Sequence, residues 1–289
     1  MKIDIEIFIQ NELKKITNKK FSKKYIDKHL IPIVNNINNS NDKKFIISGP
    51  QGSGKTTLAK LLKIVLEKIY KKKVMLLSID DYYLSKKKRI ELSKKIHPLL
   101  ITRGVPGTHN VKRLKKHLDQ FLQNKFPIRT LNFDKLKDDV SSKRTIIKDA
   151  DIFLLEGWCC GSKPMTDEYL YKNINDLERK SDKNNKWREF YNACLKKEYS
   201  EIFSKFDKKI YIKPPSFMHV LKWRYNQEKQ NALINKKKKF MSKKELRNFI
   251  QHFEKLTTWM AKVMPAEASI LIKIDKNQRI SDVITTDNS

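Results

Sequence analysis

The stretch FIISGPQGSGKTTLAKLL, residues 45–62, joins a short apolar run to a glycine-rich turn and then to a helical pattern. The turn satisfies the spacing GxxxxGK[ST], with Gly49, Gly54, Lys55 and Thr56 at the fixed positions. Glycines let the backbone wind closely around a phosphate chain, so successive N–H groups point inward, and the positive end of the following helix adds to that field. We therefore expect a phosphate-binding loop between a strand and a helix.

The loop and the first helical residues form the expected nucleotide site. Lys55 supplies a positive charge near the β- and γ-phosphates, and the Thr56 hydroxyl suits a magnesium ion. The sequence therefore predicts a nucleoside triphosphate bound together with Mg²⁺. The expected contacts are Gly49, Pro50, Gln51, Gly52, Ser53, Gly54, Lys55, Thr56 and Thr57.

Short apolar runs alternate with longer segments of helical spacing along the chain. Because these runs are apolar throughout, they fit strands that are buried on both faces, as in a parallel sheet. The sequence thus predicts an α/β fold of the P-loop NTPase type, with a mostly parallel central sheet and helices on both faces. The expected strands are 44–48, 74–78, 151–156, 209–213 and 268–274.

Helical patterns flank these strands. Two amphipathic helices are expected in residues 1–36, one follows the phosphate loop, and another begins at Val111. The tetrapeptide SKKE, residues 242–245, matches a capping box at the start of a further helix. We expect one domain over residues 1–289, in which 1–42 form a helical extension and 43–289 form the nucleotide-binding core.

Lysine dominates the charge of the chain. There are 63 Lys and Arg against 32 Asp and Glu, a formal net charge of +31, but only ten of the cations are Arg and the lysines are spread along the whole length. A nucleic-acid surface concentrates its charge and uses arginine forks with stacking aromatic rings. We therefore expect no nucleic-acid partner and interpret the lysines as a compositional trend on solvated faces.

The sequence shows no sign of membrane insertion. No run approaches about 20 consecutive apolar residues, and the N-terminal stretch carries acidic residues inside its short apolar part. The cysteines, Cys159, Cys160 and Cys194, are odd in number and lack metal-ligand spacing. We expect reduced thiols, a cytoplasmic location and no membrane partner, and nothing in the sequence indicates an oligomeric state.

A single acidic residue ends the third expected strand, in the segment FLLEGW. Motor ATPases usually carry a paired Asp-Glu here, and GTPases need DxxG and NKxD motifs, neither of which is present. Glu156 emerges at the carboxyl edge of the sheet, where ligands of parallel sheets bind. It could orient magnesium or a water bound to it, or it could cap a helix or lie on the surface.

Two adjacent carboxylates end the second expected strand, in SIDDYYL. Asp80 and Asp81 are costly to bury, so they face solvent, a cation or a substrate. If this strand lies beside the phosphate loop, Asp80 can take the proton of a hydroxyl aligned with the γ-phosphate. The alternative is a simple acidic turn.

The loop TRGVPGTHN, residues 102–110, precedes the helix at Val111. Arg103 and His109, with the exposed N–H groups of that helix, could form a cradle for a small anionic acceptor. A helix capped in the ordinary way by Thr108 or Asn110 explains the loop as well.

A helix is expected to begin after KPPS, and Phe217, Val220 and Leu221 mark its inner face. The spacing of Arg224 places it on the same face. An arginine on a buried stripe needs an anion. Spacing leaves two partners open, Glu228 one turn later or a nucleotide phosphate.

Taken in order, GPQGSGKTT, SIDDYYL, RGVPGTH, LEGWCCGSKP, WRYNQE and MSKKELRNFI span roughly residues 40 to 285. With these motifs the chain resembles the P-loop kinases of small metabolites, the group that contains uridine kinase, phosphoribulokinase and bacterial pantothenate kinase. Within the group it resembles the D-glycerate 3-kinase branch. The resemblance implies a phosphotransferase with an alcohol acceptor, which uses ATP and Mg²⁺ to convert a small acid, D-glycerate, to 3-phosphoglycerate.

The resemblance also implies residue roles. Asp80 matches the catalytic base, Glu156 a second acidic position that helps to hold the metal, and Arg224 a lid near residues 214–240. Lys55 and Arg224 would offset charge on the transferring phosphoryl group. The acceptor would contact Asp80, Tyr82, Arg103, His109 and Lys135.

One segment departs from the family pattern. FPIRTLNFDKLKDDVSSK, residues 126–143, matches the family loosely, through Pro127, Phe133, Asp134 and Lys135, and lacks the Gly-Arg elements that follow. The acceptor could therefore be uridine, pantothenate or a sugar phosphate. Two other classes also remain, a nucleic-acid-binding P-loop NTPase that uses the +31 charge and a non-catalytic ATP-binding module.

Overall fold

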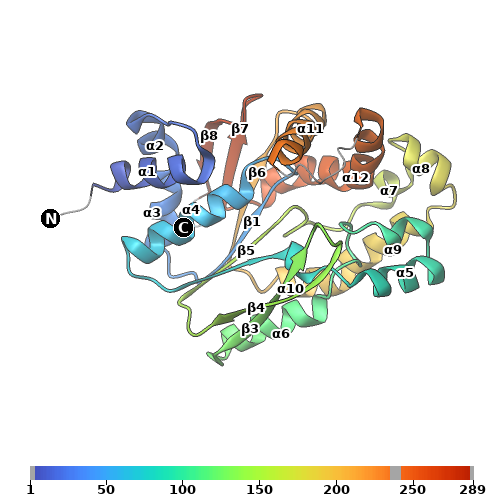
Figure 1. Ribbon diagram of the computed structural model, residues 1–289, viewed down its shortest axis with the longest axis horizontal. Coiled ribbons are helices and arrows are strands. Elements are labelled where there is room, and N and C mark those ends of the chain that lie inside the picture. Colours follow the sequence, from blue (N-terminus) through green and yellow to red (C-terminus); the bar gives the residue numbers. More distant parts are fainter. Residues whose placement is uncertain (1–3, 235–241, 287–289) are drawn as a thin grey trace.

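The computed structural model describes residues 4–234 and 242–286 and shows a central sheet with helices on both faces (Figure 1). The strands of this sheet lie in the order β2-β5-β1-β6-β7-β8, and neighbours are parallel except for β7 and β8. They are β1 (Lys44–Ser48), β2 (Val74–Ser78), β5 (Ile152–Gly157), β6 (Lys208–Lys213), β7 (Ile270–Ile274) and β8 (Ile280–Thr285). The predicted α/β fold with a mostly parallel sheet is confirmed, and each predicted strand lies within two residues of an observed one.

Strands β1, β2, β5, β6 and β7 each contribute to two hydrophobic cores, one on either face of the sheet. In β1, for example, Phe45 and Ile47 pack into one core and Ile46 into the other. Successive side chains of a strand point to opposite faces, so a strand covered on both sides must be apolar at every position. This is why the sequence shows continuous apolar runs rather than alternation.

Helices from different parts of the chain cover the two faces. One face is covered by α1 (Ile5–Thr17), α2 (Lys23–His29), α3 (Ile31–Asn39) and α4 (Lys55–Lys68), which lie together in Figure 1. The other is covered by α6 (Val111–Leu122), α9 (Lys186–Cys194), α10 (Ser200–Phe203) and α12 (Lys243–Glu267). The capping box expected at Ser242 is present, because the Ser242 and Glu245 side chains each accept a hydrogen bond from the other residue's backbone N–H.

The N-terminal segment forms three helices where two were expected. The chain turns between α2 and α3, and Pro32 stands in the first turn of α3. Proline has no N–H to donate, so α2 cannot continue through this position as one regular helix.

A second, two-stranded sheet was not predicted. It is the hairpin of β3 (Ile128–Asp134) and β4 (Asp139–Ile147), which lies beside α6 on the opposite side from the N-terminal helices (Figure 1). Much of β4 is exposed, so its sequence is polar and carries no apolar run. Strand β8 was missed for the same reason, because it is an edge strand with exposed positions.

The remaining elements connect these layers. The helix of the expected lid is α11, and residues 235–240 of the lid lie outside the described residues. In the described part of the chain, no helix is both long and apolar enough to cross a membrane. The connecting elements are the turns η1 (Ile79–Tyr82), η2 (Pro98–Ile101) and η3 (Leu195–Tyr199) and the helices α5 (Lys86–Lys95), α7 (Asp167–Tyr171), α8 (Asp176–Ser181) and α11 (Phe217–Ile234).

Candidate active site

The glycine-rich turn connects β1 to α4, as the motif requires. Gly52 and Gly54 adopt φ values of +76° and +93°, in the left-handed region that favours glycine. A Cβ atom on Gly52 would lie 2.9 Å from the Cβ of Trp223, so this position has no room for a side chain. Glycine at these positions therefore allows the tight backbone turn that directs N–H groups toward a phosphate.

A cavity of about 880 Å³ opens at this loop. It is lined by Gln51, Gly52, Ser53, Gly54, Lys55, Thr56 and Thr57 of the predicted nucleotide site, whereas Gly49 and Pro50 lie outside its lining. The predicted residues Asp80, Arg103, Lys135, Glu156 and Arg224 also line it. The structure thus brings together side chains that are up to 173 positions apart in the sequence (residues 51 and 224).

Glu156 lies directly beside the phosphate loop. Strand β5 pairs with β1, and this register sets Glu156 opposite Ile47, shortly before the loop begins. Its Oε1 accepts a hydrogen bond of 3.3 Å from the Thr56 hydroxyl, and the residue is only 6% exposed. Glu156 is therefore neither a surface residue nor the N-cap of any helix described.

The pair Thr56 and Glu156 fits a magnesium ion. Oε2 of Glu156 is buried and has no hydrogen-bond partner among the described residues, so it is free to contact a cation or a water bound to one. Residues 4–234 and 242–286 contain no group of three or more His, Cys, Asp and Glu that could hold a metal alone. Mg²⁺ commonly takes one or two protein ligands and completes its shell with phosphate oxygens and water, which matches this donor set.

Asp80 is held at both carboxylate oxygens. The Tyr83 hydroxyl donates to Oδ1 at 2.9 Å, and Nζ of Lys135 lies 2.6 Å from Oδ2. Burial by itself would raise the pKa of Asp80, but the charges of Lys135 and Lys55 and the two hydrogen bonds outweigh it and lower the pKa. The carboxylate is therefore ionised at neutral pH, as a general base must be.

The hairpin turn between β3 and β4 supplies part of the site. Lys135 reaches Asp80 from this turn, and Asp138 of the same turn pairs with Arg103, which also lines the cavity. Asp138 is itself fixed by Arg89, which is 1% exposed and donates to its carbonyl at 2.7 Å. Both cations predicted to bind an acid are therefore paired with protein carboxylates. Sequence reasoning missed Asp138, because no motif marks a residue on a polar hairpin.

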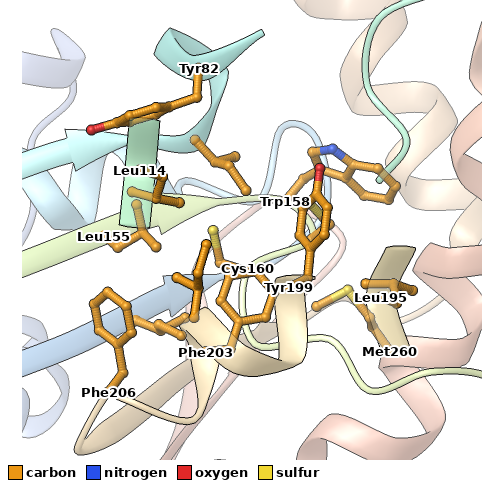
Figure 2. Packing of buried hydrophobic residues seen from close by; sticks show 14 of the residues in the cluster. Tyr82, Leu114, Leu155, Trp158, Cys160, Leu195, Tyr199, Phe203, Phe206 and Met260 are labelled. Atoms are coloured by element: carbon orange, nitrogen blue, oxygen red, sulfur yellow. The ribbon is translucent and has the colours of Figure 1, made fainter. Parts of the chain in front are cut away.

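Tyr82 does not enter the cavity, contrary to the expectation that it binds the acceptor. Its side chain is 2% exposed and packs into the core with Leu114 and Leu155 (Figure 2). Its hydroxyl forms a hydrogen bond of 2.7 Å with Nδ1 of His117. Tyr83, the next residue, points to Asp80 and lines the cavity instead. Two adjacent tyrosines on a tight turn point in different directions, and the sequence did not show which one faces the site.

His109 is also directed into the protein. It is 3% exposed, does not line the cavity, and its Nδ1 lies 2.6 Å from the Tyr199 hydroxyl. Burial lowers the pKa of His109 to about 4, so the ring is neutral at physiological pH. It therefore supplies no positive charge to an anionic acceptor. The helix cap that the sequence left open is Asn110, which accepts a hydrogen bond from the Arg113 N–H.

Arg224 lines the cavity and forms an ion pair with Glu228. Nη2 lies 2.5 Å from Oε1 of Glu228, and Nη1 donates to Gln227 at 2.9 Å. Burial lowers the pKa of Arg224 and the Glu228 carboxylate opposes that change. Since 18% of its side chain remains exposed, the guanidinium is also accessible to an anion entering the cavity.

Several curated proteins are similar in sequence to this chain. The uncharacterized kinase mug58 of Schizosaccharomyces pombe is 30% identical over 223 residues, which cover 72% of this chain and 76% of that protein. The probable ATP-dependent kinase TDA10 of Saccharomyces cerevisiae is 30% identical over 225 residues, with 71% and 73% covered. The chloroplastic D-glycerate 3-kinase of Arabidopsis thaliana is 28% identical over 218 residues, with 71% and 45% covered.

Solved structures agree with the fold. The YGR205w protein superposes with a TM-score of 0.68 at 26% identity, covering 91% of this chain and 95% of that one. D-glycerate 3-kinase from Cryptococcus neoformans has the same TM-score at 19% identity, covers 97% of each chain, and supports the fold alone. No family model matches the chain. On the sequence likeness and the shared fold, this chain belongs to the D-glycerate 3-kinase branch of the P-loop kinases of small metabolites and is an ATP-dependent phosphotransferase.

Proposed function

We propose that this kinase transfers the γ-phosphoryl group of Mg·ATP to a hydroxyl of a small carboxylic acid, and that D-glycerate is converted to 3-phosphoglycerate. The observation that carries the proposal is the meeting of a phosphate loop, an ionised Asp80 and two cations, Arg103 and Lys135, in one cavity. The relative from Arabidopsis is named for the same reaction, which supports the choice of acceptor.

The nucleotide side of the cavity is built from the loop. Its N–H groups and the N-terminus of α4 would hold the phosphates, with Lys55 and Arg224 opposing the charge that develops on the transferring group. Thr56 and Glu156 would hold Mg²⁺, which supplies charge neutralisation between the β- and γ-phosphates. Arg224 would exchange Glu228 for a phosphate oxygen when the nucleotide enters, because the carboxylate and the phosphate use the same guanidinium group.

Asp80 would orient the acceptor hydroxyl and accept its proton. Phosphoryl transfer passes through a loose transition state, so alignment of the nucleophile matters more than its basicity. Water could be aligned in the same way, and α11, which contributes Trp223 and Arg224 to the cavity lining, would close over the phosphates and exclude it.

Arg103 and Lys135 would hold the carboxylate of the acid. Each is paired with a protein carboxylate, Arg103 with Asp138 and Lys135 with Asp80. An entering acid would compete for Lys135 and draw it away from Asp80. Release of Asp80 would then coincide with binding of an acceptor that carries a negative charge.

Product analysis tests the proposal. The protein is incubated with Mg·ATP and D-glycerate, with uridine, pantothenate and glycerol in parallel, and the products are identified by mass spectrometry. We expect phosphoglycerate as the main product. A phosphorylated product from uridine or pantothenate alone would replace the proposed acceptor, and ATP hydrolysis stimulated only by added RNA would favour a nucleic-acid-dependent NTPase.

A further inference from the structure

Tyr83 joins the expected base to the buried interior of the protein. Its side chain is 5% exposed, yet its hydroxyl lies 2.9 Å from Oδ1 of Asp80 and the residue lines the cavity. The other oxygen, Oδ2, contacts Lys135, whose side chain is 60% exposed. Oδ1 of Asp80 therefore faces a buried tyrosine, whereas Oδ2 faces a long lysine side chain that is mostly exposed to solvent.

We propose that Tyr83 is a positioning residue for the catalytic base, which fixes Oδ1 of Asp80 and leaves Oδ2 as the oxygen that receives the acceptor hydroxyl. The inference rests on the proposed role of Asp80 and adds to it the choice between its two oxygens.

The ring of Tyr83 is fixed by its neighbours. It stacks on His109 with centroids 4.6 Å apart and planes 23° from parallel. The edge of Phe133, from β3, lies at 5.2 Å and 75°. The backbones of Tyr83 and His109 also form a bridge, which is extended by a hydrogen bond of 2.9 Å from the Leu84 N–H to the Thr108 carbonyl. The hydroxyl thus has its position before any ligand binds, so it costs no reorganisation during the reaction.

His109, on which the Tyr83 ring stacks, is itself held by Tyr199. The Gly107 N–H donates to the Tyr199 hydroxyl oxygen at 3.0 Å, so the proton of that hydroxyl is available to Nδ1 of His109. The buried histidine that the sequence suggested as an acid ligand is, in this arrangement, the surface on which Tyr83 stacks.

Loss of the Tyr83 hydroxyl should be visible as a change in the pKa of Asp80. Tyr83 is itself a neutral donor at working pH, because burial and the neighbouring Asp80 raise its pKa well above the usual range. A donor to a carboxylate stabilises the ionised form, so loss of the Tyr83 hydroxyl raises the pKa of Asp80. Besides Tyr83, the titratable or charged groups that influence Asp80, or are influenced by it, are Lys55, Asp81, His109, Lys135, Cys159, Cys160 and Arg224.

The substitution Tyr83→Phe tests the inference, because it keeps the ring and removes only the hydroxyl. Two measurements are made on the full chain. The first is the titration of Asp80 by NMR of protein labelled with ¹³C at aspartate carboxyl groups, with the signal identified by its loss in Asp80→Asn. The second is the pH dependence of kcat with Mg·ATP and D-glycerate.

We expect the NMR midpoint of Asp80 and the acidic limb of kcat to move upward together, by about one pH unit, because a hydrogen bond to a charged group is of that strength. The KM for ATP should stay within about twofold, because Tyr83 does not touch the loop, while kcat falls as Asp80 loses its fixed orientation. An unchanged midpoint with an unchanged limb would overturn the inference.

Tyr82→Phe is the matched control. It removes the adjacent buried hydroxyl, which is bonded to His117 and makes no contact with Asp80. It should leave the Asp80 midpoint in place, and an equal shift in both variants would show a general loss of structure instead. The NMR titration needs no turnover, so a wild-type protein that fails to phosphorylate D-glycerate would refute the proposed acceptor while Tyr83 is still tested.

Discussion

Lys135 and Asp80 form an ion pair in the cavity, with Nζ 2.6 Å from Oδ2, although Asp80 follows β2 of the large sheet and Lys135 lies in the turn of the hairpin. The base of the proposed reaction is thereby paired with a cation from the hairpin. The same lysine is the one that we expect to bind the acid. One side chain therefore links recognition of the acceptor to the state of the base.

Substitution of Lys135 by methionine separates these two effects. Loss of a hydrogen bond to a charged group should raise the KM for D-glycerate by roughly 10- to 100-fold. Because Lys135 lowers the pKa of Asp80, its removal raises that pKa, and the acidic limb of kcat/KM should move to higher pH. The ratio of activities on glycerate and glycerol should also fall. Steady-state kinetics with both acceptors across pH checks this, and an unchanged ratio would remove Lys135 from acceptor recognition.

Asp80→Asn keeps the shape of the side chain and removes its ability to accept a proton. We expect kcat to fall by about 10²- to 10⁴-fold, the range for loss of general base catalysis. ATP affinity, measured by calorimetry, should change little, because Asp80 lies on the acceptor side. Lys55→Ala is the informative comparison, since it should lower both turnover and nucleotide affinity. Wild-type rates in Asp80→Asn would refute the assignment of the base.

Glu156→Gln tests the magnesium site. The amide keeps the hydrogen bond from Thr56 but loses the charge that would attract the ion. The Mg²⁺ concentration for half-maximal activity should rise by roughly 10- to 100-fold, as for other groups that support a bound metal. ATP binding in the presence of EDTA should not change. Equal Mg²⁺ requirements in the two proteins would show that Glu156 has a structural role only.

The lowered pKa values of two buried histidines predict how the free energy of unfolding depends on pH. Burial is the main cause that lowers the pKa of both His109 and His117 from 6.5 to about 4. The unfolded chain takes up these protons below pH 6.5 and the folded protein does not, so stability is full above pH 6.5 and is lost as pH falls toward 4. Each histidine contributes on the order of 3 kcal/mol to this loss. Urea unfolding across the range measures it.

His117→Gln provides the control for this prediction. The variant should be less stable at neutral pH, because the bond to Tyr82 is weakened. Its stability should nevertheless fall less steeply below pH 6.5, since one of the two titrating groups is gone. A slope equal to that of the wild type would mean that His117 does not titrate in this range.

The parts that the sequence predicted are those in which one physical requirement decides the residue type. Strands covered on both faces must be apolar at each position, and a phosphate loop must contain glycine where a side chain would collide, as at Gly52. Residues at the ends of parallel strands share one sheet edge, so Asp80 and Glu156 could be placed beside the loop before their contacts were known. These inferences needed no knowledge of long-range packing.

The parts that the sequence did not predict depend on packing between distant segments. Which of Tyr82 and Tyr83 lines the cavity depends on which ring packs against Leu114 and Leu155 in the core. Both residues are tyrosines, so residue type does not distinguish them. His109 turns inward because Tyr199, 90 positions later, offers a hydrogen bond. The hairpin could not be predicted from apolar runs. It forms a separate two-stranded sheet, and its strands are not buried on both faces.

That small sheet shares no backbone pairing with the large one, and the acceptor side of the cavity meets it mainly through side chains such as Lys135 and Asp138. On the proposed function, a change of residues in the hairpin would therefore alter the choice of acceptor while the residues that hold the nucleotide stay the same. Kinases that share the phosphate loop could therefore differ in substrate through changes confined to such a hairpin.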